Sequence, residues 1–140
     1  MRAAEFEVQC AVGKLIEARL TWLGTRADVE RMQMMMLEAF TAAGPQGVIC
    51  ADWRQAHVFA PEVGDALLEL LKRGNRQFKR SAVLVAAHEA TFGLQVERLF
   101  RDAKNEARRS FRAPEPMLEW LSEALTPIEQ QRARAFLGSR

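Results

Sequence analysis

The side chains best able to do chemistry in this sequence are two histidines and the carboxylates near them. His57 lies shortly after Asp52, and His88 immediately precedes Glu89. An imidazole can bind a metal ion or exchange a proton near neutral pH, and a carboxylate can assist in either task. The spacing matches no compact metal-ligand motif, and no third strong ligand or nucleophile accompanies the pair. Solvated or capping histidines are the alternative, so we expect no metal, no cofactor and no catalytic residue.

Motifs for common enzymatic reactions are missing from the chain. It contains no GxxxxGK[ST], GxGxxG, GxSxG, HExxH or CxxC pattern. Nucleotide hydrolysis, dinucleotide binding and serine-hydrolase chemistry therefore have no support. Cys10 and Cys50 have no Cys or His at ligand spacing, and both fall in predicted strands. We interpret them as small, buried apolar side chains.

The composition is typical of one globular domain over residues 1–140. Hydrophobic residues make up 49% of the chain and charged residues 27%, so a sizeable core can form. No apolar run approaches the roughly 20 residues that a membrane span needs. Residues 1–7 contain no apolar signal core and carry two acids, so we expect a cytoplasmic location.

Positive charge is concentrated in one segment although the net charge is only +2. Residues 72–112 hold eleven Lys/Arg against four Asp/Glu. Many of these cations fall at predicted helix ends, where they complement the helix dipole. The segment lacks interleaved exposed aromatic residues, so we expect no nucleic-acid partner.

The hydrophobic pattern predicts the element order ββαβαβαβαα. Thr25 with Asp28 predicts a helix start, and Pro61 suits the first position of the central helix. Four methionines between Met32 and Met36 are interpreted as core filler. The predicted strands lie near residues 6–12, 16–22, 48–51, 81–87 and 108–112, and the helices near 25–43, 61–73, 91–105, 114–125 and 126–137.

Such βα units favour an α/β fold with a mostly parallel five-stranded sheet. The last strand, around Phe111, is expected to be short and exposed. Ligands of open α/β sheets bind beyond the carboxyl ends of the strands. The loops that carry His57 and His88 should therefore share one edge.

Asp52 either caps its loop or pairs with Arg54. Trp53 either anchors a partner or packs over the central helix.

Residues 48–52 (VICAD) and 59–64 (FAPEVG), continuing to Leu71, resemble the central segment of SpoIIAA-like, STAS-type domains, the anti-sigma-factor-antagonist-like modules. Residues 81–85, 91–98 and 120–121 resemble uncharacterised bacterial members of that group. The resemblance spans about residues 5–125. It implies a single SpoIIAA-like domain with helices mainly on one face of the sheet, one face incompletely covered, and residues 126–137 as an appendage. The superfamily also includes the lipid-exchange Sec14 fold.

The chain departs from partner-switching members of that family at one turn. Those members carry a phosphorylatable Ser before the central helix, and the matching positions here are Pro61 and Glu62. Neither side chain accepts phosphate, which argues against regulation by phosphorylation at this turn. Glu62 is either a permanent mimic of the phosphorylated state or an ordinary acid at a helix start.

The resemblance and the missing reactive groups together favour a non-catalytic regulatory or scaffolding module that binds another protein. We expect partner binding through the loop and first turn of the central helix. The alternative is a small-molecule or lipid-binding domain of the Sec14-related type, which needs a sizeable apolar pocket. An enzyme using His57 and His88 is the least favoured. The open edge of the first hairpin makes a homodimer plausible. The expected partner-binding residues are Trp53, Arg54, His57, Phe59, Glu62, Val63 and Asp65.

Overall fold

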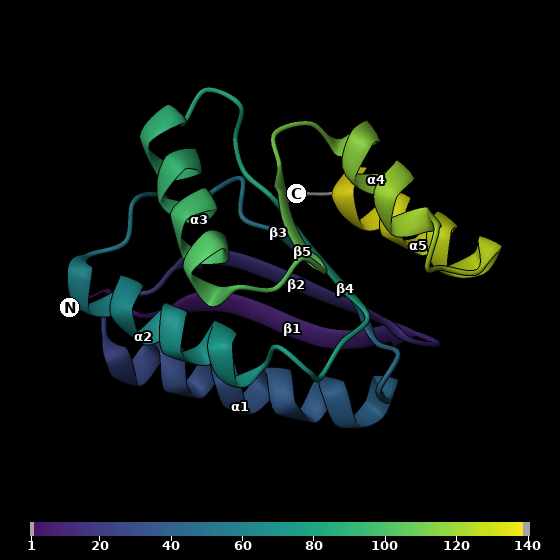
Figure 1. The fold of residues 1–140 in the computed structure, drawn as a ribbon, viewed down its shortest axis with the longest axis horizontal. Coiled ribbons are helices and arrows are strands. Elements are labelled where there is room, and N and C mark those ends of the chain that lie inside the picture. Colours follow the sequence, from purple (N-terminus) through teal and green to yellow (C-terminus); the bar gives the residue numbers. More distant parts are fainter. Residues whose placement is uncertain (1, 139–140) are drawn as a thin grey trace.

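Alternating apolar and polar residues at the start of the chain form a β-hairpin in the computed structural model, which describes residues 2–138 (Figure 1). Strands β1 (Glu5–Val12) and β2 (Leu15–Trp22) pair antiparallel. Gly13 in the turn has φ +55°, a left-handed conformation that glycine adopts without a steric penalty. The first hairpin expected from the sequence is therefore present, with Gly13 in its turn.

The rest of the chain alternates between strands and helices before ending in two helices, which is the predicted order. The strand bounds confirm the hydrophobic pattern to within a few residues, although the strand predicted over 81–87 stops at Leu84. The elements are α1 (Arg26–Ala43), β3 (Val48–Asp52), α2 (Pro61–Arg73), β4 (Arg80–Leu84), α3 (Ala90–Ala103), β5 (Arg108–Phe111), α4 (Pro114–Ser122) and α5 (Pro127–Gly138).

Within the described residues the strands form one five-stranded sheet in the order β1-β2-β3-β4-β5. β1 runs antiparallel to β2, and the other neighbouring pairs are parallel. The α/β class and the mostly parallel sheet are thus confirmed. Because β2 to β5 run in one direction, the loops that follow their carboxyl ends lie along the same edge of the sheet.

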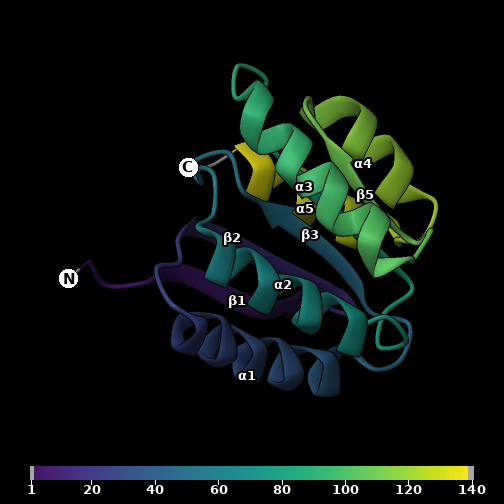
Figure 2. The same ribbon diagram turned by 60° about the vertical axis from the view of Figure 1, so that its left-hand side comes forward.

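Helices α1, α2 and α3 cover one face of the sheet (Figures 1 and 2). Helix α1 begins with the predicted capping box, in which Thr25 Oγ1 accepts from Asp28 N and Asp28 Oδ2 accepts from Thr25 N. Of the methionines predicted as core filler, Met32 is buried, but Met34 is 66% exposed. A helix of this kind turns only part of its circumference toward the sheet, so four neighbouring side chains cannot all face the core.

Helices α4 and α5 cover the opposite face, which corrects two expectations (Figure 2). That face is not left open, since Met117 and Leu121 of α4 are fully buried against Val48 and Leu84 of the sheet. The segment predicted as an appendage is also part of this second core, because Ala133 of α5 is fully buried. The larger share of the helices within residues 2–138 still lies on the first face, as predicted.

The last strand is short, as predicted, but it is not simply exposed. Arg108, its first residue, is only 7% exposed, while Arg109 is exposed.

None of the helices formed by residues 2–138 combines the length and the apolar character that a membrane crossing requires.

Candidate functional site

Asp52 and Arg54 form a tight ion pair just beyond the carboxyl end of β3. Arg54 Nε donates to Asp52 Oδ1 at 2.9 Å, and Arg54 Nη2 donates to Asp52 Oδ2 at 2.8 Å. The same Nη2 donates to Leu137 O of α5 at 2.7 Å. Both interpretations of Asp52 are confirmed, because its Oδ1 also accepts from Arg54 N at 3.1 Å and so caps the loop. Arg54, expected to contact a partner, is instead occupied within the fold.

The carboxyl of Asp52 titrates below its ordinary range. Burial on its own raises the pKa of Asp52, but the hydrogen bonds and charge of Arg54, with the charge of Arg19, outweigh it and lower that pKa. Arg19 Nε lies 3.6 Å from Asp52 Oδ2. Asp52 is therefore a charged structural anchor at neutral pH and not a proton donor.

Three of the expected partner-binding side chains belong to the core, which corrects that expectation. Trp53, Phe59 and Val63 are 7%, 5% and 0% exposed. The ring centroids of Trp53 and Phe59 lie 5.8 Å apart, and Phe92 of α3 lies 5.3 Å from Phe59. A partner cannot reach these rings in this conformation. Of the two interpretations of Trp53, the structure supports packing of its ring inside the fold.

The loop between β3 and α2 is held in place by Gln95 of α3. Its side-chain amide accepts from Phe59 N at 2.8 Å and donates to Phe59 O at 3.0 Å. These two hydrogen bonds to the backbone of Phe59 hold the loop in place, and the Phe59 ring stays buried in the core. The residues on either side of Phe59 then point outward, and Val58 is 50% exposed.

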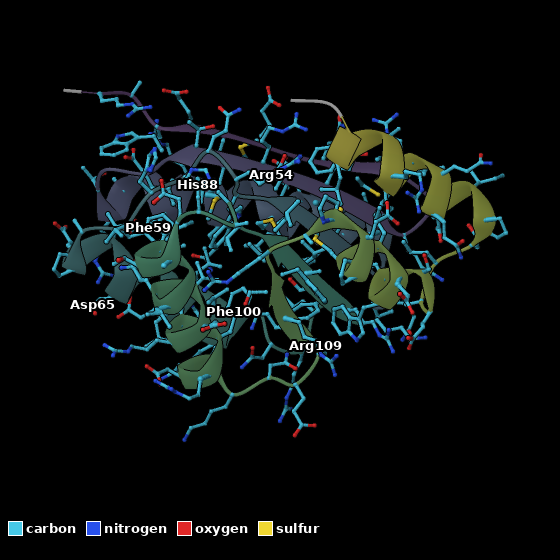
Figure 3. All side chains as sticks on the ribbon, turned by 90° about the horizontal axis from the view of Figure 1, so that it is seen from above. Arg54, Phe59, Asp65, His88, Phe100 and Arg109 are labelled. Atoms are coloured by element: carbon cyan, nitrogen blue, oxygen red, sulfur yellow. The ribbon has the colours of Figure 1, made fainter. Side chains whose placement is uncertain are left out.

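The exposed part of this edge includes His57, Val58, Glu62 and Asp65. Figure 3 shows Phe59, Asp65 and His88 on one side of the molecule, away from Arg109. Glu62 sits in the first turn of α2 directly after Pro61, and Ala60 provides no side-chain cap. Val58 was not among the predicted residues. In the sequence, Val58 lies between His57 and Phe59, and this neighbourhood is the signal that could have identified Val58 as exposed.

The two histidines meet at one carboxylate, as their shared edge predicted. His57 Nδ1 lies 3.3 Å from Glu89 Oε1, and His88 Nε2 lies 3.8 Å from the same atom. Both imidazoles are well exposed, with 65% and 84% of the side chains accessible. No group of three or more His, Cys, Asp or Glu within residues 2–138 is arranged to hold a metal ion. The arrangement is a solvated electrostatic contact between two loops.

A small pocket of about 100 Å³ opens beside Val58, between the loop after β2 and the loop after β3. Trp22 lines this pocket, and its indole nitrogen is buried without a hydrogen-bond acceptor among the described residues. The guanidinium carbon of Arg2 lies 4.5 Å from the centroid of the Trp22 ring. The pocket is lined by Thr21, Trp22, Leu23, Gly24, His57, Val58, Phe59 and Ala60.

Two cations of the basic segment stack on an aromatic ring from helix α4. Helix α4 brings Trp120 to the basic residues, and the guanidinium carbons of Arg80 and Arg109 lie 4.8 Å and 4.9 Å from its ring centroid. Arg80 also pairs with Glu123 at 3.1 Å. Trp120 lies outside residues 72–112 and is only partly exposed, so it does not contradict the expectation that this segment lacks interleaved exposed aromatic residues. The absence of a nucleic-acid partner stays a prediction, which filter binding at low salt would test.

A solved structure shares this fold. An uncharacterised protein of the DUF3478 family from Shewanella loihica PV-4, described as having a SpoIIAA-like fold, matches with a TM-score of 0.63 at 16% sequence identity. The match covers 86% of this chain and 97% of that one. No protein-family model matches the sequence, and no curated protein matches it at a significant level. The chain therefore has a SpoIIAA-like α/β fold, as the sequence resemblance implied.

Proposed function

We propose that this protein is a non-catalytic regulatory or scaffolding module that binds another protein through the carboxyl edge of its sheet. The supporting observation is the half-exposed Val58, which lines a small pocket at this edge of the sheet. An apolar side chain of a partner would cover Val58 and fill the pocket beside it. Exposed His57, Glu62 and Asp65 would form the polar rim around this contact.

The surface is thus smaller than the one expected from the sequence. Trp53, Phe59 and Val63 support it from below, and Arg54 holds the loop to α5. Glu62 at the first turn of α2 offers a permanent negative charge where partner-switching relatives place a phosphorylatable Ser. A constant charge would give a binding surface that needs no kinase. An adjacent gene for a kinase, phosphatase or sigma factor would instead point to partner switching.

A capture experiment from native lysate tests the surface. Val58→Asp should abolish recovery of a partner that wild-type protein retains, because it places a charge in the apolar contact. Ile128→Asp is the matched control, since Ile128 is 68% exposed on α5, away from this edge. If Val58→Asp and Ile128→Asp recover the same proteins as wild type, the surface is assigned wrongly. Both variants change exposed residues, so folding should be preserved.

A lipid carrier of the Sec14-related type is less well supported. The apolar cavity between α1, α2 and the sheet has a volume of about 90 Å³. For comparison, an engineered apolar cavity that binds benzene has a volume of about 150 Å³. A long acyl chain has no room in this conformation.

A homodimer through the free edge of β1 stays a prediction, which light scattering on purified protein would test. A cytoplasmic location also stays a prediction.

A further inference from the structure

Strand β5 forms an open edge of the sheet, at the opposite end from β1. Among the described residues it pairs with β4 alone. Helices α3 and α4 contact it from the two faces of the sheet (Figure 2). The outer side of β5 is therefore flanked by helices but is not paired with another strand.

This outer side presents main-chain groups that a further strand could use. Ser81 N donates to Ala107 O, and Val85 N donates to Phe111 O, each at 2.9 Å. Because neighbouring residues of a strand direct their peptide groups to opposite sides, the N–H and C=O of Ser110 face away from β4. Ser110 is also partly exposed. Such an edge can accept a strand from another chain.

The open edge carries positive charge on both faces of the sheet. Residues 108–112 (RRSFR) contain three arginines. Arg109 lies on the α4 side, where its guanidinium carbon is 4.9 Å from the centroid of the Trp120 ring. Arg112 lies on the α3 side, because a Cβ atom on Gly93 of α3 would overlap its guanidinium. Arg109 and Arg112 are both exposed.

These two charges are not balanced within the fold. Neither Arg109 nor Arg112 forms an ion pair with a carboxylate in residues 2–138. The neighbouring Arg80, by contrast, pairs with Glu123 at 3.1 Å. Arginine and carboxylate groups form strong hydrogen bonds in pairs. A strand with carboxylates on both of its faces would therefore complement this edge.

Other occupants suit the edge less well. A second copy of β5 would bring arginines of the two chains together, and like charges on paired strands repel. A phosphodiester backbone has no N–H group to pair with the carbonyl of Ser110. The Trp120 ring already carries the guanidinium groups of Arg80 and Arg109, so a base would have to displace them in order to stack.

We propose that β5 binds an extended acidic segment of a partner protein, which adds to the sheet as a further strand and places carboxylates on Arg109 and Arg112. Because β5 has four residues, a segment of about five residues would cover it. Adjacent acidic residues of that segment would reach both faces. The inference does not depend on the proposed partner surface, since Figure 3 shows Arg109 well away from His88.

Three labelled peptides test the proposal on wild-type protein. The acidic probe contains Glu-Asp pairs between Val and Thr, the neutral probe has Gln-Asn pairs instead, and the third probe is the acidic one with N-methylated central residues. Fluorescence anisotropy should show saturable binding of the acidic probe and at least tenfold weaker binding of the other two. Equal binding of the acidic and N-methylated probes, or no saturable binding of the acidic probe, would show that the proposal is wrong.

Variants then locate the binding site. Ser110→Pro removes the outward N–H and keeps every charge, and an edge strand tolerates proline where its N–H faces solvent. This variant, and one that combines Arg109→Gln with Arg112→Gln, should each weaken the acidic probe at least tenfold. Arg73→Gln is the matched control, because Arg73 is exposed on α2, which packs between α1 and α3. An equal loss with Arg73→Gln would mean diffuse attraction and would refute the assignment to β5.

Two further measurements separate this edge from the alternatives. A single-stranded oligonucleotide with the same net charge should bind at least tenfold more weakly than the acidic probe at about 0.15 M salt. Tighter binding of the oligonucleotide would make the edge a nucleic-acid interface and overturn the proposal. Val58→Asp should leave the acidic probe unaffected, so failure of the other surface is distinguishable. If Ser110→Pro does not fold, the arginine variant and the three peptides still decide.

Discussion

At the scale of single residues, this protein places ionised side chains inside the fold and balances most of them there. The side chain of Glu17 is 2% exposed, and its carboxylate receives two hydrogen bonds from Arg132 and one from Gln9. Asp52 is balanced by Arg54 and Arg19. Arg108 is the contrasting case, with hydrogen bonds but no opposite charge. Balanced pairs hold the fold together, whereas Arg108 is held by Asn75 and by the carbonyl of Leu71 in the last turn of α2.

Replacing Asp52 by Asn should lower the free energy of unfolding by about 3 kcal/mol at neutral pH, because it leaves the largely buried Arg54 without a counter-charge. The pKa of Asp52 is lower in the folded protein than its ordinary value of 3.8. Its stabilising contribution is therefore present above about pH 4 and is lost as the pH falls through the folded pKa. Urea unfolding from pH 7 to pH 3 should show the difference from wild type shrinking in acid.

Asp102→Asn is the control for this series, since Asp102 is exposed at the end of α3. It should change stability by less than about 0.5 kcal/mol. A constant difference between wild type and Asp52→Asn down to pH 3 would contradict the assigned role of Asp52.

At the scale of elements, polar contacts tie both ends of α5 to distant segments of the fold, in addition to its apolar packing in the second core. Glu129 Oε1 accepts from Thr126 N at 2.8 Å and so caps the helix, while Oε2 accepts from Lys14 N at 2.9 Å in the hairpin turn. A Cβ atom on Gly13 would overlap Glu129 Oε2. The turn of the first hairpin and the start of the last helix are therefore built around one carboxylate. At the other end of α5, Arg54 donates to Leu137 O.

Glu129→Ala should loosen α5 and destabilise the protein by about 1–2 kcal/mol, because the backbone amides of Thr126 and Lys14 lose their acceptor. Hydrogen exchange should become faster in Pro127–Gly138 and in the hairpin turn, with little change in α1 to α3. Glu119→Ala, at an exposed position of α4, is the matched control. Unchanged exchange in α5 would show that Glu129 does not hold the helix.

At the scale of the whole molecule, one sheet serves two cores. Along β3, Ile49 and Ala51 face the core under α1 to α3, while Val48 and Cys50 face the core under α4 and α5. Successive side chains of a strand point to opposite faces. Neither core can be lost without exposing the strands that the other core also needs. Burial accordingly raises the pKa of the Cys50 thiol far above its ordinary value.

We therefore expect the two cores to unfold in a single transition. Trp53 reports on the first core, and Trp120 packs against the second. Two variants test this, one that retains only Trp53 and one that retains only Trp120, with Phe at the other tryptophan positions. In each variant, the urea midpoint followed by tryptophan fluorescence should equal the midpoint followed by circular dichroism. A Trp120 transition that precedes the loss of circular dichroism would mean that α4 and α5 unfold separately.

Local pattern was enough to predict the element order, the α/β class, the Thr25 cap and the Asp52–Arg54 pair. Each of these depends on residues close together in the sequence, through strand alternation, helix periodicity or a short loop. The candidate surface was predicted less well. Trp53 follows the end of β3, where alternation no longer assigns a face, and its burial depends on Phe92 from α3.

The sequence by itself determined which segments become strands and helices, and it placed both histidine loops at one edge of the sheet. The tertiary structure alone decided that α5 completes a second core, that Val58 and not Trp53 faces outward, and that Arg108 is buried beside an apolar cavity. The physical reason is the same in each case. Whether a side chain is covered depends on distant segments that fold over it, and a local pattern carries no record of them.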